Sequence, residues 1–276
     1  LMMDMRQGIK GKINKNYRTQ ISDMKNLRDR YPGKILPFIA IDPNNPQATD
    51  IFIKAFSEDN FFGVKIYPSL GYLPTHPILM DIFRICEEKN IPIVTHCGGA
   101  EVRNSHKILK NVEGIEYNHN KTGEFIKIDK NRTKFLPTKN DYKYYFNNPI
   151  NWYPVLKSFP KLRLNFAHFG STEEWVKLAK GKNNSWVLRI MDFMYNFEYV
   201  YADLSFNIFE QKLYDFVRKK IEDNKILREK TLYGSDWYMI ATKGHFRNIK
   251  TNFITSMGDG LMEDISRNNP LRFFGI

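Results

Sequence analysis

The chain has 276 residues, 42% of them hydrophobic and 14% aromatic, so it can bury a full-sized core as one large domain or two. No apolar run approaches about 18 residues, which excludes a transmembrane helix. No signal peptide is expected, and the opening Leu1-Met2-Met3 suggests that upstream sequence is missing.

The net charge of +12 comes from 42 basic and 30 acidic residues, which are spread over many segments. No nucleic-acid-binding motif accompanies them, so we expect no specific nucleic acid and a Lys-rich, Asn-rich solvated surface, with adaptation to an anionic substrate as an option. Cys86 and Cys97 form neither a disulfide framework nor a paired metal motif. A cytoplasmic protein that binds a small molecule, with homo-oligomerisation left open, is the resulting expectation.

Strand and helix patterns alternate through the first hundred residues. The opening LMMDM resembles the end of a buried strand, and apolar spacing or β-branched runs define the elements after it. The pattern predicts a helix over 17–30, a strand over 35–42, a helix from about 46, a strand over 61–68, a helix over 75–89 and a strand over 91–98.

Residues 100–148 interrupt this alternation with a polar, basic and aromatic segment. Long connections in compact domains are usually functional or disordered, so we interpret the segment as a lid, with disorder as the alternative. Residues 124–128 are a candidate strand of a hairpin within it. The whole chain, residues 1–276, is expected to be a single barrel domain that carries this insertion.

The alternation resumes after the insertion and brings the number of expected parallel strands to seven. A closed barrel needs eight, so a (β/α)8 TIM barrel with its first β/α unit upstream is the favoured fold. A seven-stranded or open doubly wound sheet is the alternative. The later elements are a helix over 151–159, a strand over 162–170, a helical region over 172–195 interrupted near 181–184, a strand over 200–206, a helix over 209–227, a strand over 230–237, a helix over 244–257 and a final helix and apolar plug over 261–276.

Three strands end in side chains that can bind a metal: His96, His168 and Asp236. The carboxyl ends of barrel strands are where active sites lie. Strand alternation places His168 on the face of Leu164 and Phe166, and all three side chains in the barrel interior.

Imidazole and carboxylate ligands suit zinc, which activates bound water as a nucleophile at neutral pH. A single histidine at a strand end is more often structural than a ligand. Three such groups on similar β/α units favour a divalent metal site, with zinc as the expected ion.

Four segments together resemble the amidohydrolase-related family of metal-dependent TIM-barrel hydrolases and decarboxylases. They are residues 63–98, ending in IVTHCG, residues 159–170 with AHFG, residues 200–205 with VYADLS, and residues 232–237 with LYGSDW. The resemblance covers essentially the whole chain. It implies that His96 and Asp236 bind metal, that His168 either binds metal as well or polarises the substrate and moves protons, and that Asp236 also serves as a general base, so that His168 and Asp236 are the expected catalytic residues.

The family's His-x-His pair on the first strand has no counterpart in this sequence. Other residues have two interpretations each. Lys65 is expected to form an ion pair or to contact a carboxylate of the substrate. A carboxylated lysine that binds metal is the less favoured interpretation. Asp203 and Ser205 either hydrogen-bond a ligand histidine or cap a helix, and Trp237 and Tyr238 either line a pocket or pack in the core.

The expected activity is hydrolysis of a C–O or C–N bond in a small, carboxylated substrate by metal-activated water. Non-oxidative decarboxylation by the same ligand set is the nearest enzymatic alternative. A truncated, non-catalytic barrel is the alternative of another class. A metal-dependent nuclease is disfavoured because GSDW lacks an acidic residue before Asp236.

Overall fold

The computed structural model describes residues 16–98, 116–118, 125–127 and 146–276. The chain divides into two compact units, which we describe separately. Unit 1 comprises Leu1–His96 and Ala100–Leu162, and unit 2 comprises Cys97–Gly99 and Arg163–Ile276. The expected opening strand and most of the expected lid lie outside the described residues, and the single-domain expectation stays a prediction.

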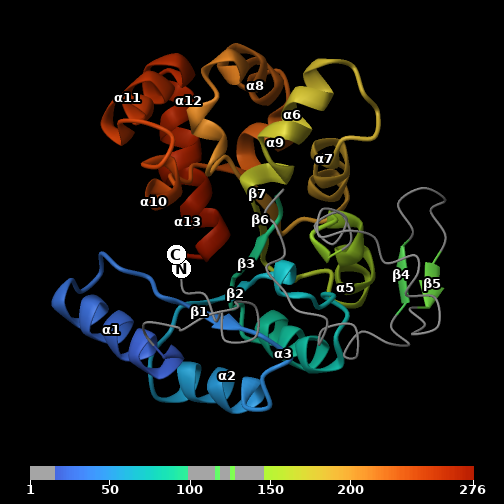
Figure 1. The fold of residues 1–276 in the computed structure, drawn as a ribbon, viewed down its shortest axis with the longest axis vertical. Helices are drawn as coiled ribbons and strands as arrows, with labels where there is room; N and C mark the ends of the chain where they lie inside the picture. The colour runs from blue at the N-terminus through green and yellow to red at the C-terminus, as the bar shows by residue number, and fades with distance from the viewer. Residues whose placement is uncertain (1–15, 99–115, 119–124, 128–145) are drawn as a thin grey trace. The chain divides into compact units, whose positions relative to one another are not determined.

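Unit 1 contains three parallel strands joined in the order β1-β2-β3. Its α1, α2 and α3 helices lie along one side of β1 and β2 (Figure 1). The predicted alternation of strands and helices over residues 17–96 is therefore confirmed. The elements are α1 (Tyr17–Arg30), β1 (Phe38–Ile41), α2 (Ala48–Ser57), β2 (Gly63–Ile66), η1 (Pro68–Leu70), α3 (Pro77–Glu88), β3 (Ile93–His96), η4 (Pro149–Trp152) and α5 (Tyr153–Ser158).

The strands of unit 1 are buried on both faces, as their nearly continuous apolar sequences predict. Gly63 is required at the start of β2, because a Cβ atom there would overlap the Phe38 ring and lie 2.6 Å from the Pro92 carbonyl oxygen. The absence of a side chain at Gly63 thus lets β1 and β2 pair at full length.

Two short strands of the insertion are described, and they form an antiparallel hairpin. They are β4 (Glu116–Asn118) and β5 (Phe125–Lys127). The expected strand over 124–128 and its place in a hairpin are confirmed.

Unit 2 contains the parallel strands β6, β7 and β8 in that order. Phe166 of β6 stacks on Phe193 of α7, with ring centroids 6.0 Å apart. The elements are β6 (Leu164–Ala167), η5 (His168–Gly170), α6 (Thr172–Ala179), α7 (Trp186–Asn196), β7 (Val200–Asp203), η6 (Asn207–Phe209), η7 (Gln211–Leu213), α8 (Tyr214–Glu222), α9 (Lys225–Lys230), β8 (Thr231–Leu232), α10 (Trp237–Ile240), α11 (Phe246–Met257), α12 (Asp259–Glu263), η8 (Asp264–Asn268) and α13 (Asn269–Phe274).

The single helix predicted over residues 209–227 is wrong, because the segment divides into α8 and α9. Asn224 has an extended backbone, with φ −135°, and its side chain accepts a hydrogen bond from the Leu227 backbone N–H. A side chain that caps the following turn starts a new helix, and this interaction separates the two.

The C-terminal segment includes η8, which is a π-helix between α12 and α13. Phe273 is buried, and its ring lies 5.2 Å from that of Tyr201 on β7. The expected apolar plug at the end of the chain is confirmed by this contact. Within the described residues no helix is long and apolar enough to cross a membrane.

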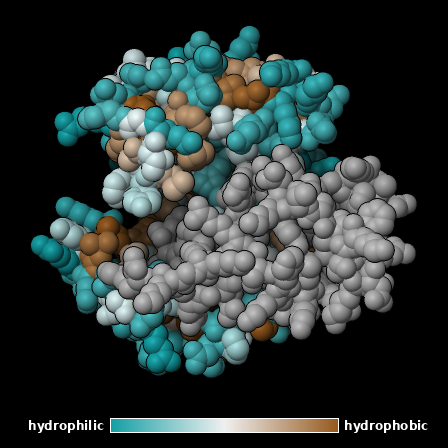
Figure 2. All heavy atoms as spheres, viewed as in Figure 1, coloured by the Kyte–Doolittle hydropathy of each residue, from teal (hydrophilic) through white to brown (hydrophobic). Residues whose placement is uncertain are grey.

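Hydrophilic side chains cover most of the unit 2 helices at the top of Figure 2, with smaller hydrophobic patches between them. This distribution agrees with the expected solvated surface.

Candidate functional site

The carboxyl ends of the unit 1 strands carry a row of polar side chains. Ala40, Lys65 and Val94 are register partners across β1, β2 and β3. Because side chains alternate along a strand, the positions two residues further on share one face. Those positions hold Asp42, Tyr67 and His96.

His96 ends β3, and 9% of its surface is exposed. Its ring packs edge-on against Tyr67, with centroids 4.5 Å apart. Asp42 is 1% exposed. His96 is a candidate from the sequence, whereas Asp42 and Tyr67 were not predicted. The signal that would have found them is their position at the carboxyl end of an expected strand.

Lys65 lies one layer deeper on the same face as this row and is 5% exposed. A lysine buried to this extent is rare unless another group pairs with it. The structure therefore favours a specific interaction of the ammonium group over a solvated side chain. Whether that interaction includes a substrate carboxylate stays a prediction.

In unit 2 the structure brings together His168, Asp203 and Ser205. The His168 Nδ1 atom lies 3.0 Å from the Ser205 Oγ atom and 3.1 Å from the Ser205 carbonyl oxygen. Ser205 Oγ in turn donates a hydrogen bond to Asp203 Oδ1. Ser205 therefore contacts the His168 ring and Asp203 accepts from the His168 backbone N–H, whereas the role of His168 as a metal ligand stays a prediction.

Asp203 is 8% exposed and accepts four hydrogen bonds. Besides the Ser205 hydroxyl, the donors are the side-chain amide of Asn165 at 2.6 Å and the backbone N–H groups of His168 and Ser205 at 3.1 and 3.0 Å. A buried carboxylate with this many donors is a fixed anchor, because moving it would leave several buried groups without partners.

A second polar contact holds the His168 backbone. Asn207 donates its side-chain N–H to the His168 carbonyl oxygen at 2.7 Å, and Thr172 donates its hydroxyl to Asn207 Oδ1 at 3.0 Å. His168 is therefore held by its ring, its N–H and its carbonyl group at once.

Left-handed backbone conformations follow all three strands of unit 2. His168, Phe206 and Asp236 have φ values of 68°, 65° and 43°. Each costs a non-glycine residue on the order of 1–3 kcal/mol, and such strain concentrates at functional sites. The carboxyl-end edge of this sheet is thus the strained edge of unit 2.

The prediction that His168 shares a face with Leu164 and Phe166 is wrong, whereas its place in the barrel interior stays a prediction. Strand alternation placed it on the face of Leu164 and Phe166, but Phe166 packs against α7. The left-handed φ of His168 ends the strand alternation, and the ring contacts Ser205, which lies just past the strand residue Asp203.

Asp236 is half-buried and directly precedes α10 after the short strand β8. Two residues earlier, a Cβ atom on Gly234 would lie 2.6 Å from the Ser205 Cβ atom. Gly234 is therefore a crowded position, and its close approach links the β8 end to the Ser205 position. Trp237 and Tyr238 are 61% and 69% exposed, so the core-packing interpretation of these residues is wrong.

Among the described residues, no group of three or more His, Cys, Asp or Glu side chains is arranged to hold a metal ion. His96 belongs to unit 1, and His168 and Asp236 belong to unit 2. The three-residue metal centre therefore stays a prediction. The donor chemistry fits a zinc-type ion, since these residues supply two imidazoles and a carboxylate, and His168 has the outer hydrogen bond that ligand histidines usually make.

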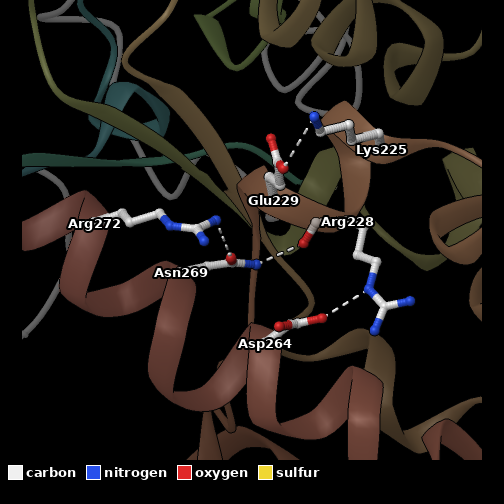
Figure 3. A pocket seen from close by; sticks show the side chains of 6 residues that line it. All are labelled: Lys225, Arg228, Glu229, Asp264, Asn269 and Arg272. Carbon is white, nitrogen blue, oxygen red and sulfur yellow. Dashed lines mark hydrogen bonds and ion pairs between the residues drawn. The ribbon is translucent and has the colours of Figure 1, made fainter.

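A cavity of about 150 Å³ lies between α9, η8 and α13 of unit 2 (Figure 3). Its charges are largely compensated within the protein, because Arg228 Nε contacts Asp264 Oδ2 at 2.7 Å and Lys225 lies 4.0 Å from Glu229. Burial raises the pKa of Asp264, but hydrogen bonds from Arg228 and Asn268 outweigh it and lower the pKa overall.

The same cavity is bordered by Asn269, which is 1% exposed. Its side-chain amide donates to the carbonyl oxygens of Arg228 and Thr231, each at 2.7 Å. Thr231 begins β8, so this cavity adjoins the amino end of the strand. We interpret the group as a structural polar network that joins the C-terminal helices to α9 and β8.

The amidohydrolase family model matches residues 12–276 of the sequence. The match covers nearly the whole chain and includes His96, His168 and Asp236. This chain therefore belongs to the amidohydrolase family, which supports an enzymatic function. A comparison with curated proteins finds no significant match.

Solved structures with the same fold are distant in sequence. A TIM-barrel protein from Bordetella bronchiseptica is 17% identical, with a TM-score of 0.60 over 92% of this chain and 72% of that one. A probable 2-pyrone-4,6-dicarboxylic acid hydrolase from Acinetobacter baumannii, with citric acid bound, is 15% identical, with a TM-score of 0.55 over 94% and 79%.

A third similar structure is the 4-oxalomesaconate hydratase of Rhodopseudomonas palustris. It is 14% identical, with a TM-score of 0.53 over 94% of this chain and 72% of that one. Together these structures establish an α/β fold of the TIM-barrel type. The expected fold class is confirmed, whereas the proposed upstream β/α unit stays a prediction.

Proposed function

We propose that this amidohydrolase is a metal-dependent hydrolase that cleaves a C–O or C–N bond in a small carboxylated substrate. The observation that carries the proposal is the strand-end histidine His168, which a buried carboxylate and hydroxyl hold in one orientation. Rigid placement of a group that binds metal or transfers a proton is what hydrolysis at a carbonyl carbon requires.

The proposed roles depend on the chemistry of each side chain. His96, His168 and Asp236 would hold a divalent ion, which when bound lowers the pKa of water and polarises a carbonyl group. Asp236 would transfer protons between the attacking water and the leaving group, and His168 would do so where it does not hold the ion, because its one lone pair cannot serve both purposes. The Asp203 network would keep the His168 ring from rotating away from the reacting atoms.

The carboxylated substrate class has separate support. The chain carries an excess of 12 positive charges, and Lys65 is buried on the strand face that also carries His96. The structurally similar hydrolase from A. baumannii is described with a dicarboxylic acid substrate and bound citric acid. An ammonium group of this kind would pair with a substrate carboxylate.

The test combines metal analysis with substrate turnover by the full chain. Lactones and amides bearing carboxylates, beginning with 2-pyrone-4,6-dicarboxylate, are assayed before and after treatment with a chelator. Chelator-sensitive hydrolysis without release of carbon dioxide supports the proposal. Chelator-sensitive release of carbon dioxide would instead identify a decarboxylase, and no turnover with no bound metal would support the non-catalytic alternative.

Site variants separate metal binding from turnover. His96→Ala and Asp236→Ala should each lose the bound metal, whereas His245→Ala, at an exposed position before α11, should keep both metal and activity. Unchanged metal content in both His96→Ala and Asp236→Ala would contradict the site.

A further inference from the structure

The hydrogen bonds around His168 determine which ring nitrogen carries the proton. Among the described residues, Ser205 places two atoms near Nδ1, its carbonyl oxygen at 3.1 Å and its hydroxyl oxygen at 3.0 Å. A carbonyl oxygen can only accept a hydrogen bond. This contact is favourable if Nδ1 is protonated and repulsive if Nδ1 has a lone pair.

The Ser205 hydroxyl group also favours a protonated Nδ1 atom. Its one proton is donated to Asp203 Oδ1, a carboxylate oxygen that can only accept. The hydroxyl therefore presents a lone pair to His168 Nδ1. If the hydroxyl proton turned to His168, the Asp203 carboxylate would face an oxygen lone pair at close range.

Asp203 cannot readily turn away to relieve such a conflict. Its second oxygen accepts from Asn165 at 2.6 Å, and its first oxygen also accepts the backbone N–H groups of His168 and Ser205. The lack of a side chain at Gly234 leaves room for Ser205 in this position. The direction of the Ser205 hydroxyl is thus set by groups that do not touch the imidazole ring.

We propose that Ser205 and Asp203 are positioning residues that hold neutral His168 with its proton on Nδ1 and its lone pair on Nε2. Nε2 is then the atom that binds a cation or accepts a proton, and neutral His168 cannot donate a proton from that atom. The use of this lone pair rests on the proposed function, but the tautomer itself exists without metal or substrate.

The tautomer is measured on the full chain after labelling the histidine rings with ¹⁵N and removing metal with a chelator. Long-range ¹H–¹⁵N correlation spectra distinguish protonated from unprotonated ring nitrogens in neutral histidine. The His168→Gln spectrum identifies the His168 signals among those of the six histidines. The Nδ1–H form is expected to exceed the Nε2–H form at least tenfold in the wild-type protein. A predominant Nε2–H form would overturn the proposal even if the enzyme proves to be a hydrolase.

Ser205→Ala tests the hydroxyl group, because it removes one acceptor and keeps the carbonyl oxygen. The ratio of Nδ1–H to Nε2–H is expected to fall several-fold. Ser185→Ala is the matched control, since Ser185 is also buried but donates its hydroxyl to the Glu174 carbonyl oxygen and caps α7. An unchanged ratio in Ser205→Ala would overturn the positioning role, as would an equal change in Ser185→Ala.

Discussion

Gly234 is the position where the smallest side-chain change should disturb the candidate site. Its backbone lies against Ser205, so an added Cβ atom would approach the Ser205 Cβ atom to 2.6 Å and Asp203 Oδ1 to 3.2 Å. Two carbon atoms cannot remain at that distance, and Ser205 must move. The movement would lengthen the contact between Ser205 and His168.

Gly234→Ala should therefore destabilise the protein by about 1–3 kcal/mol, the usual cost of overpacking a filled interior. It should also reduce the preference of His168 for the Nδ1–H form. Urea unfolding measures the first effect, and the ring ¹⁵N spectrum measures the second.

Gly244→Ala is the control, because a Cβ atom there would meet only Ile249 Cδ1, at 3.4 Å. It should leave both measurements nearly unchanged. Equal stability of the two variants would show that the close approach at Gly234 is relieved without cost.

The sequence was informative about which residues lie at strand ends and uninformative about their orientation. An apolar strand that ends in His and Gly correctly located His96 and His168. The face of His168 was wrong because alternation holds only while the backbone is extended, and a left-handed φ at a non-glycine residue has no reliable sequence signal. The Asp203–Ser205–His168 contacts were an open alternative because they join residues from two different strands.

The junction between α6 and α7 depends on a buried carboxylate. Glu174 is 3% exposed, accepts the backbone N–H of Trp186 at 2.8 Å and pairs with Lys177 at 2.5 Å. Trp186 is the first residue of α7. The side chain of one helix thus satisfies a backbone donor at the start of the next.

Glu174→Ala should lower the free energy of unfolding by about 3 kcal/mol, because it leaves a buried N–H without an acceptor and removes a charged hydrogen bond. Glu173→Ala is the neighbouring control on the exposed side of the same helix and should change stability by no more than about 0.5 kcal/mol. Chemical denaturation of both variants measures the difference, and similar losses would contradict the assigned role.

The start of α3 should be sensitive to pH. The Nδ1 atom of His76 accepts a hydrogen bond from the Ile78 backbone N–H at 3.3 Å, and burial lowers the pKa of His76 below 6.5. A lowered folded-state pKa means that the unfolded chain binds the proton more strongly. This contribution to stability is complete above pH 6.5 and is lost as the pH falls through the lowered value.

His76→Asn replaces this cap with a good N-cap residue that does not titrate. The wild-type protein should lose stability relative to His76→Asn between about pH 6.5 and pH 5. Near pH 8 the difference in stability between the two proteins should not change with pH. Thermal unfolding across this range measures the difference. A constant offset at every pH would contradict the prediction.

Helices and strands were predictable where the spacing of apolar residues was clear. They were not predictable where the hydrogen bond of one side chain determines where a helix ends. The apolar period of residues 17–30 correctly predicted α1, and the glycine and asparagines near 181–184 correctly marked the gap between α6 and α7. The break at Asn224 was missed because the amphipathic pattern continues through it. Only the cap that Asn224 provides to Leu227 distinguishes two helices from one.

For the molecule as a whole, the relevant property is the net charge of +12. A positive chain attracts anionic ligands over distances that salt screens, with a Debye length of about 10 Å at 0.1 M ionic strength. The dissociation constant for tricarballylate, a simple tricarboxylate, should therefore rise several-fold between about 50 and 200 mM salt. Calorimetric titration measures it.

The neutral triethyl ester of tricarballylate is the comparison ligand, and salt should not weaken its binding. A salt-independent dissociation constant for the tricarboxylate would contradict a role of the overall charge in ligand attraction. The sequence predicted this property directly, because net charge depends on composition alone.

The exposure of Trp237 provides a built-in optical reporter. Of the four tryptophans, Trp152, Trp175 and Trp186 are buried to at least nine-tenths, whereas Trp237 is 61% exposed and directly adjoins Asp236 in the sequence. An indole in water emits at longer wavelength than one in an apolar core, so red-edge excitation would select Trp237. Shifts in its emission would track events beside Asp236 in real time, without any attached dye.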